Sequence, residues 1–147
     1  MLSQTAEYSL RLLVFLARRY PDASSSSELA GSTQVPEAFC EKLLQRLAQT
    51  GFVLAKRGRR GGYRLARSPE KIRVVEVIEQ VDRLREYASC PLGLEEHAVE
   101  LCPLHARLNQ AVAAVKRILG NATLRDMANP RRRKACSFPA TRYRPTD

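Results

Sequence analysis

Residues 52–67, FVLAKRGRRGGYRLAR, read as two short strands joined by a tight turn. Strand-forming residues at 52–54 and 63–65 favour extended backbone, and glycines interrupt the stretch between them. These glycines are predicted to adopt positive φ angles: Gly58, Gly61 and Gly62. Six cations and no carboxylate lie between residues 53 and 67. The stretch therefore predicts a strongly basic β-hairpin.

The residues before this hairpin predict two helices joined by a tight turn. Ser25 and Glu28 have the spacing of a capping box, which begins a short helix that is expected to stop near Gly31. Pro36 suits the first position of a second helix, whose apolar residues recur along one face: Phe39, Leu43, Leu44 and Leu47. Gly51 is placed to end this helix. A helix-turn-helix followed directly by a hairpin is a winged helix, whose second helix can lie in the major groove of DNA.

The rest of the chain predicts further helices around this unit. Apolar side chains recur at helical spacing over 4–19, 74–81 and 103–119, and Thr123 is placed to cap a last short helix, LRDMA. Residues 83–102 show little periodicity and predict a loop. The apolar seam of the third of these helices has nearly heptad spacing, which indicates packing against a second copy of the chain.

The predicted fold is mostly α with a small β-hairpin, namely a winged helix-turn-helix with a long C-terminal dimerisation helix. We divide the chain into a DNA-binding domain at 1–82, a cysteine-containing sensor loop and dimerisation helix at 83–128, and a basic, disordered tail at 129–147. The boundary near residue 83 is thus expected to separate a DNA-reading half from a sensing half.

Charge and composition limit the class of partner. The 147 residues hold 25 Lys and Arg against 15 Asp and Glu, which gives a net charge of +10. Such an excess favours a polyanion, because each phosphate that a cation neutralises releases condensed counterions. RNA and an anionic membrane surface are the competing partners. No apolar run reaches about 20 residues and no secretion signal is recognised, so we expect a cytoplasmic protein without a membrane span. The usual catalytic motifs are absent, which argues against an enzyme.

Ten residues are candidates for contact with double-stranded DNA. One group, in and before the second helix, would reach base edges or phosphates: Ser32, Thr33, Gln34, Glu37 and Lys42. The other group, in the hairpin, would follow the phosphate backbone or enter a minor groove: Lys56, Arg57, Arg59, Arg60 and Arg64. Gln34 is the best candidate for a base contact, although its position also suits a helix cap. A solvated basic turn is the alternative, but it leaves the preceding helix-turn-helix unexplained.

Two stretches carry a resemblance to a known family. AEYSLRLLVFLA at 6–17 resembles the opening helix of the Rrf2 family of winged-helix transcription regulators, and RGRRGGYRLARSPEKIRVVEVIEQV at 57–81 resembles its wing and following helix. The GGYRLA core is the most specific part, and the resemblance extends over residues 1–128. The family includes iron–sulfur and nitric-oxide sensors. The resemblance therefore implies a homodimeric, sequence-specific regulator, more often a repressor, that binds a palindromic operator.

The same resemblance implies a site for an iron–sulfur cluster. Cluster-binding relatives hold iron with three cysteines spaced six residues apart, and some add a histidine three residues after the last. Cys90, Cys102 and His105 match the first, third and histidine positions, whereas the middle position holds Glu96. Some relatives add an acidic residue from the first helix of the partner subunit, and Glu7 matches that place. These five residues are the implied ligands, for a 2Fe–2S cluster in preference to a 4Fe–4S cluster.

The residues themselves leave other sensor chemistries open. Zinc also accepts Cys and His ligands, and Cys90 and Cys102 could instead form a reversible disulfide. His97 is a further candidate ligand beside the missing cysteine. A family member without a cluster would respond to a metabolite or to a partner protein. Cys40 is expected to be a small packed residue of the second helix, and Cys136 an incidental thiol in the tail.

Overall fold

The computed structural model describes residues 2–59, 61–82, 84, 86–93 and 102–129. Its elements follow the order α1 (Gln4–Arg19), α2 (Ser26–Thr33), α3 (Glu37–Gln49), β1 (Val53–Lys56), β2 (Gly62–Leu65), the 3-10 turn η1 (Pro69–Lys71), α4 (Val74–Val81), α5 (Pro103–Gly120) and α6 (Leu124–Ala128). The described part is mostly helical with a two-stranded antiparallel sheet. The predicted fold class is confirmed.

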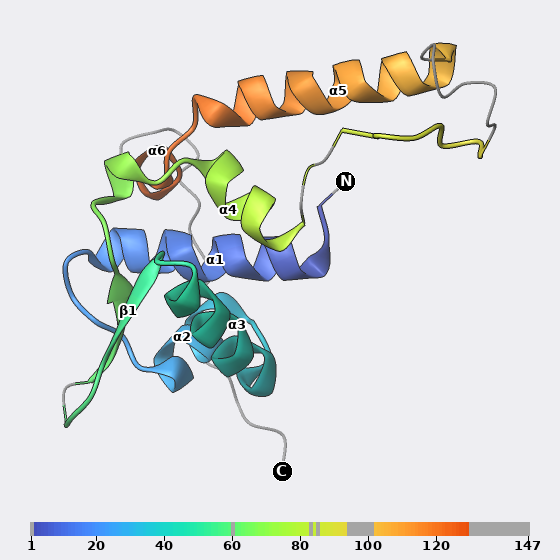
Figure 1. The fold of residues 1–147 in the computed structure, drawn as a ribbon. Coiled ribbons are helices and arrows are strands. Elements are labelled where there is room, and N and C mark those ends of the chain that lie inside the picture. The colour runs from blue at the N-terminus through green and yellow to red at the C-terminus, as the bar shows by residue number, and fades with distance from the viewer. Residues whose placement is uncertain (1, 60, 83, 85, 94–101, 130–147) are drawn as a thin grey trace.

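Helix α1 lies at the centre of the molecule. Figure 1 shows α2 and α3 on one side of it and α4 and α6 on the other, and α1 contacts all four. The Ser3 hydroxyl caps the helix by accepting the backbone N–H of Ala6 at 3.2 Å. Apolar residues at helical spacing are fully buried along one face, among them Leu12, Leu13 and Leu16. The core that supports the helix-turn-helix is therefore built on α1.

Helix α2 begins as the sequence predicts but ends later. The Ser25 hydroxyl accepts the backbone N–H of Glu28 at 3.1 Å, as one half of the predicted capping box does. The Glu28 carboxylate pairs with Arg19 at 3.0 Å, which joins α2 to the end of α1. The predicted stop near Gly31 is wrong, because the helix continues and the chain turns only at Gln34, which has a left-handed φ of 57°.

Helix α3 buries the predicted face at Leu43, Leu44 and Leu47 but differs at its first turn. Pro36 is its N-cap rather than its first residue. Cys40 is fully buried, whereas Phe39 is 37% exposed and makes an edge contact with the Tyr8 ring, at 5.7 Å between centroids. The assignment of Phe39 to the core is therefore wrong, because this ring packs on the flank of α1 instead of beneath α3. The expectation that Cys40 is a small packed residue is confirmed.

The hairpin, here called the wing, pairs Val53 with Leu65 and Lys56 with Gly62. Backbone bonds to Ser24 on the other edge of β2 extend the ladder, because Tyr63 donates to the Ser24 carbonyl at 2.8 Å and accepts from the Ser24 N–H at 2.9 Å. This third segment holds the wing against the start of α2. The wing is thus fixed to the helix-turn-helix by main-chain hydrogen bonds.

The three glycines of the wing serve different purposes. Gly58 and Gly62 have φ angles of 113° and 143°, as predicted. Gly61 does not have a positive φ, so that expectation is wrong. It is required for another reason, since a Cβ there would lie 2.4 Å from the Lys56 carbonyl oxygen and 2.7 Å from that of Gly58. At this position the tip of the hairpin leaves no room for a side chain.

We expect Gly62→Ala to destabilise the protein more than Gly58→Ala. Both residues have positive φ, but a Cβ on Gly62 would also lie 2.3 Å from the Ser24 carbonyl oxygen, whereas nothing lies within 4 Å of one on Gly58. The strained backbone alone costs about 1 kcal/mol, and the clash should bring the Gly62→Ala loss to about 2–3 kcal/mol. Urea denaturation of both variants measures the difference, and equal losses would contradict the account.

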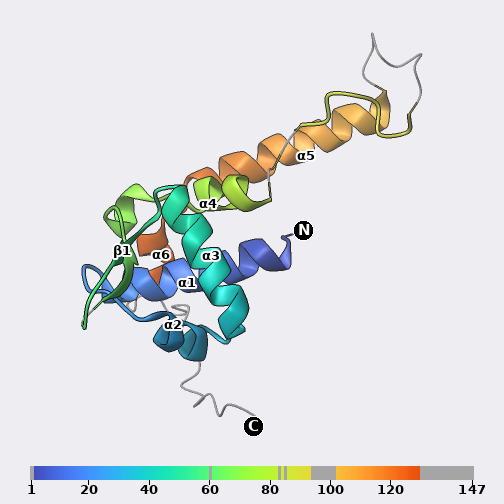
Figure 2. The ribbon, with the colours of Figure 1, turned by 60° about the horizontal axis from the view of Figure 1, so that its bottom comes forward.

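Helices α4, α5 and α6 complete the other side of the molecule. Figures 1 and 2 show α5 beside α4, with the N-terminal half of α5 extending away from α1 and the helix-turn-helix. Helix α6 returns to the core, where Leu124 is fully buried and α6 contacts α1 and η1. The division at residue 83 stays a prediction, but α6 packs with the N-terminal elements. Within the described residues, no helix is long and apolar enough to cross a membrane.

Candidate nucleic-acid interface and cysteine pair

The outer face of the helix-turn-helix is polar. Glu37 and Lys42 are exposed on α3, Gln34 is exposed in the turn before it, and Ser32 is half-buried at the end of α2. Gln34 is the C-cap of α2, whereas the N-cap of α3 is Pro36, so the alternative that Gln34 caps the second helix is wrong. Two exposed residues of α3 were missed, although they lie one and two turns after Glu37: Glu41 and Gln45. These side chains are available to a groove of duplex DNA.

Thr33 is a correction to the predicted contact set. The prediction placed it on the exposed surface, but the residue is only 1% exposed. Its hydroxyl donates to the Leu29 carbonyl at 2.7 Å, one turn earlier in α2. Because α2 extends further than predicted, Thr33 belongs to the helix interior. It supports the turn and does not face a ligand.

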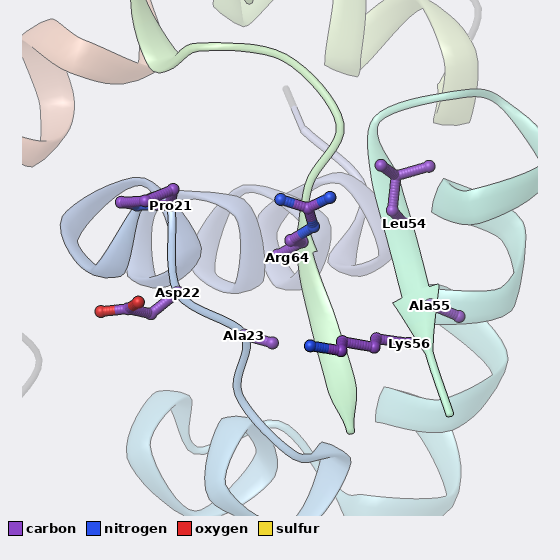
Figure 3. Close-up of a pocket in the computed structure, with 7 residues that line it drawn as sticks. All are labelled: Pro21, Asp22, Ala23, Leu54, Ala55, Lys56 and Arg64. Atoms are coloured by element: carbon purple, nitrogen blue, oxygen red, sulfur yellow. The ribbon is translucent and has the colours of Figure 1, made fainter. Parts of the chain in front are cut away.

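The exposed face of the wing gathers cations beside an open pocket. Lys56 and Arg64 lie on one face of the ribbon, since Leu54 is paired with Arg64 and side chains alternate along a strand. The pocket has a volume of about 690 Å³ and is lined by Pro21, Asp22, Ala23, Leu54, Ala55, Lys56 and Arg64. Figure 3 shows the Lys56 side chain crossing from β1 over β2 toward Ala23 and the Arg64 side chain over β2, whereas the Asp22 carboxylate points away from both. The pocket is therefore suited to an anion such as a phosphate.

The other cations of the hairpin differ in their surroundings. Arg57 and Arg59 are exposed near the tip, and Arg60 lies outside the described residues. Arg67 is engaged elsewhere, with its guanidinium over the Phe52 ring at 5.5 Å and paired with Glu76 at 3.2 Å. The basic surface thus consists of the strands and the tip, whereas Arg67 fastens the end of the wing to α4.

Cys90 and Cys102 lie close together at the start of α5. Their Sγ atoms are 3.8 Å apart, well beyond the bond length of about 2.05 Å in a disulfide, so the two are separate thiols. Cys102 is the N-cap of α5, and its sulfur accepts the backbone N–H of His105 at 3.4 Å. The fold therefore brings together two of the predicted ligands from positions twelve residues apart.

His105 adds a buried imidazole next to this pair in sequence. The residue is 2% exposed, and its Nε2 lies 2.5 Å from the Tyr87 carbonyl oxygen. Its Nδ1 is buried without a hydrogen-bond partner. Such an orphaned nitrogen is unusual in a folded protein and suits a ligand atom. Two thiols and one unused imidazole nitrogen are donor types that iron and zinc both accept.

Within the described residues, neither His105 nor any other predicted ligand forms a metal-binding group with the two thiols. In the described ranges, no group of three or more His, Cys, Asp or Glu is arranged to hold a metal ion. Glu7 is exposed on α1. Glu96 and His97 lie outside the described residues, as do Cys136 and the tail from residue 130 onward. Cys90 and Cys102 are therefore the two predicted ligands whose side chains the structure places in contact.

Cys40 is a fully buried thiol that lies outside this pair. Burial raises the pKa of its thiol from 9.0 to about 11, and the nearby carboxylates of Glu41 and Glu37 add to the effect. Because the folded protein favours the neutral thiol, this group contributes stability below about pH 9 that is lost as the pH rises toward 11. We expect the free energy of unfolding to fall more steeply over that range in the wild type than in Cys40→Ala, measured by urea titration. Parallel curves would contradict this.

The comparisons with known proteins agree with this geometry. Residues 2–130 match the Rrf2 family model, described as an iron-dependent transcriptional regulator. The regulator NsrR of Bacillus licheniformis is 32% identical over 129 residues, and the match covers 86% of this chain and 90% of that NsrR. NsrR of Bacillus subtilis is 33% identical over 129 residues, and the match covers 86% of this chain and 88% of that NsrR. Among solved structures, CymR, the global cysteine regulator of B. subtilis, has a TM-score of 0.71 at 26% sequence identity. The match covers 87% of this chain and 95% of the CymR chain. IscR of T. potens has a TM-score of 0.72 at 23% sequence identity, and the match covers 86% of this chain and 85% of the IscR chain. The chain belongs to the Rrf2 family and is a winged-helix, DNA-binding transcription regulator, not an enzyme.

Proposed function

We propose that two copies of this chain bind a palindromic operator as a repressor and that the 90–105 segment senses redox state, nitric oxide or iron–sulfur status. The 3.8 Å contact between the sulfurs of Cys90 and Cys102 carries the sensing part, because it places two reactive groups where α5 begins. A change of bonding there can alter how α5 and the DNA-binding elements are arranged, which is coupling between two sites.

The dimer is supported by the incomplete burial of α5. Of the 18 residues of this helix, His105 is the one that is buried. Leu104 and Ile118 are 42% and 65% exposed, and they lie on the same apolar flank as Leu108 and Val115. A second copy of the helix would cover this flank, and two-fold symmetry would place two wings on operator half-sites about one helical turn apart.

An iron–sulfur cluster is the first choice of sensor. Cys90, Cys102 and the Nδ1 atom of His105 would hold it, with Glu96 or Glu7 of a partner subunit as further ligands. The orphaned Nδ1 supports this set. The family model is described as iron-dependent, which favours iron over zinc. When bound, a cluster supplies a centre whose charge and ligand bonds change on oxidation, nitrosylation or loss.

The cluster is tested by purifying the full chain without oxygen and recording its visible spectrum together with its iron and sulfide content. We expect absorption between about 320 and 460 nm with equal amounts of iron and sulfide. Cys90→Ser and Cys102→Ser should each abolish it, whereas Cys40→Ala, the buried control, should retain it. A colourless, iron-free protein after anaerobic reconstitution would contradict the cluster.

Reversible thiol oxidation is the second candidate, and the same sulfur contact favours it. Two thiols already 3.8 Å apart need only a small approach to form a disulfide. In this case an oxidant of the disulfide class would convert the pair without any metal. Mass determination after exposure to oxidised glutathione distinguishes the candidates, since the disulfide removes two hydrogens and leaves no iron.

Sequence-specific DNA binding is tested by selection from a random duplex pool. We expect a palindromic sequence to be enriched, and binding to it to exceed binding to unrelated duplex by about a thousandfold at physiological salt. Uniform, salt-sensitive binding to every duplex, or a preference for single-stranded RNA, would contradict the proposal.

A further inference from the structure

We infer that Asn109 is a positioning residue of the sensor: it clamps the Tyr87 peptide and thereby holds His105 and the loop that carries Cys90 against α5. The inference rests on the proposed sensing role of Cys90 and Cys102. No sequence pattern indicated this residue, since a lone asparagine on a helix has no local signal. It becomes visible only in the contacts between α5 and the 86–93 loop.

Asn109 bonds both polar groups of one residue in that loop. The Tyr87 N–H donates to the Asn109 Oδ1 at 2.8 Å, and the Asn109 Nδ2 donates to the Tyr87 carbonyl at 3.3 Å. Figures 1 and 2 both show this loop running along the N-terminal half of α5. An amide side chain carries a donor and an acceptor side by side, so it can bond the N–H and the carbonyl of one residue at once. The clamp therefore fixes the loop in one register on the helix.

The Tyr87 carbonyl that Asn109 clamps also sets the tautomer of His105, which lies one helical turn before Asn109. The Tyr87 carbonyl oxygen lies 2.5 Å from the His105 Nε2. A carbonyl only accepts hydrogen bonds, so Nε2 carries the proton and the buried Nδ1 keeps its lone pair in the neutral ring. Outer partners of this kind orient histidine ligands in metal sites. Asn109 thus acts on the imidazole through Tyr87 without touching it.

The same loop delivers Cys90 to Cys102. Cys90 follows Tyr87 by three residues, and its carbonyl accepts the Gly93 N–H at 3.0 Å in a tight turn. Its sulfur reaches that of Cys102, which the helix holds as N-cap. If the clamp is removed, the loop gains freedom and the two thiols spend less time in contact. Their effective concentration toward each other should then fall.

The experiment measures this quantity on the full, reduced chain in glutathione buffers. Two protein thiols and one oxidised glutathione give one Cys90–Cys102 disulfide and two reduced glutathiones, so the protons and electrons of the thiols pass to glutathione. A Cys40→Ala, Cys136→Ser background leaves these two thiols as the chain's cysteines. Mass determination after acid quenching gives the equilibrium constant for each variant.

We expect Asn109→Ala to lower the equilibrium constant about tenfold, which corresponds to about 30 mV in the disulfide potential. The equilibrium constant of Asn109→Asp should lie between those of the background and Asn109→Ala, because its carboxylate accepts the Tyr87 N–H but cannot donate to the Tyr87 carbonyl. Gln110→Ala, an exposed neighbour on α5, is the matched control and should equal the unmutated background. Circular dichroism and sedimentation should be the same for all four, since folding and assembly do not depend on the clamp.

The failure of this inference can be told apart from that of the sensing proposal. An Asn109→Ala constant equal to that of the background, or an equal fall in Gln110→Ala, overturns the positioning role while leaving the dithiol in place. A background chain whose thiols do not couple in any buffer overturns the dithiol itself and the inference with it. An Asn109→Ala chain that fails to fold overturns the claim that the clamp acts only on the loop. Asn109→Asp keeps the bond from the Tyr87 N–H and loses the bond to the Tyr87 carbonyl, so its constant then measures the contribution of the second bond alone.

Discussion

Replacing Lys56 and Arg64 together by glutamate should lower the affinity of the protein for its operator by about a hundredfold or more at physiological salt. Both cations lie on the exposed face of the wing beside the 690 Å³ pocket, and the nearby Asp22 carboxylate points away from them. Each lost phosphate contact removes about 0.9 from the salt slope of the binding constant, and the new carboxylates add repulsion. A titration by fluorescence anisotropy at several salt concentrations measures both effects.

A control variant with two charge reversals outside the wing separates the local effect of Lys56 and Arg64 from the effect of the lower net charge. Lys71→Glu with Arg73→Glu changes the net charge by the same amount at two exposed positions between the wing and α4. We expect this control to lose less than tenfold in affinity, because charges beyond about 10 Å are largely screened at such salt. Equal losses in the two double variants would mean that the wing makes no specific contact, and would contradict the proposed interface.

Ile118→Asp should convert the proposed dimer to monomers, with a dissociation constant raised by about a hundredfold or more. Ile118 is the most exposed large apolar residue of the described chain, at 65%, and lies on the apolar flank of α5. An unpaired carboxylate buried between two helices costs several kcal/mol, and about 2.7 kcal/mol already amounts to a hundredfold. Sedimentation equilibrium measures the change, and operator affinity should fall with it because two linked half-site contacts become independent.

The control for this variant uses the opposite side of the same helix. Ala113 is exposed and lies about half a turn around α5 from Ile118, so Ala113→Asp introduces the same charge outside the proposed contact. We expect it to remain dimeric. A wild-type chain that is monomeric at micromolar concentration, or an Ile118→Asp chain that still dimerises, would show that α5 is not the dimer helix.

The winged helix-turn-helix could be predicted from sequence because its signals are local. The Ser25 cap, the glycine-rich turn and the basic strands each act over a few residues, and all three are found in the structure. The error at the start of α3 arises because tertiary packing decides which side chain is buried. Phe39 and Cys40 both suit an apolar stripe on α3. In the structure Phe39 packs against the Tyr8 ring of α1 and stays partly exposed, whereas Cys40 is buried in the core.

The proposed sensor site was predictable only in part, and through the family resemblance. The resemblance singled out Cys90, Cys102 and His105, and the structure brings the two sulfurs into contact. It could not indicate Tyr87 or Asn109, because their hydrogen bonds join positions 22 residues apart and depend on how the loop lies on α5. Such contacts follow from the fold and have no spacing that a sequence pattern could detect.

In the proposed mechanism, the state of Cys90 and Cys102 controls binding to the operator. The most direct measurement is the affinity of the anaerobically purified protein for its selected operator before and after exposure to nitric oxide or oxidised glutathione. We predict a change of at least about tenfold in the wild type, within the usual range of coupling between two sites, and no change in Cys90→Ser with Cys102→Ser. An affinity that stays the same in the wild type under both treatments would contradict the claim.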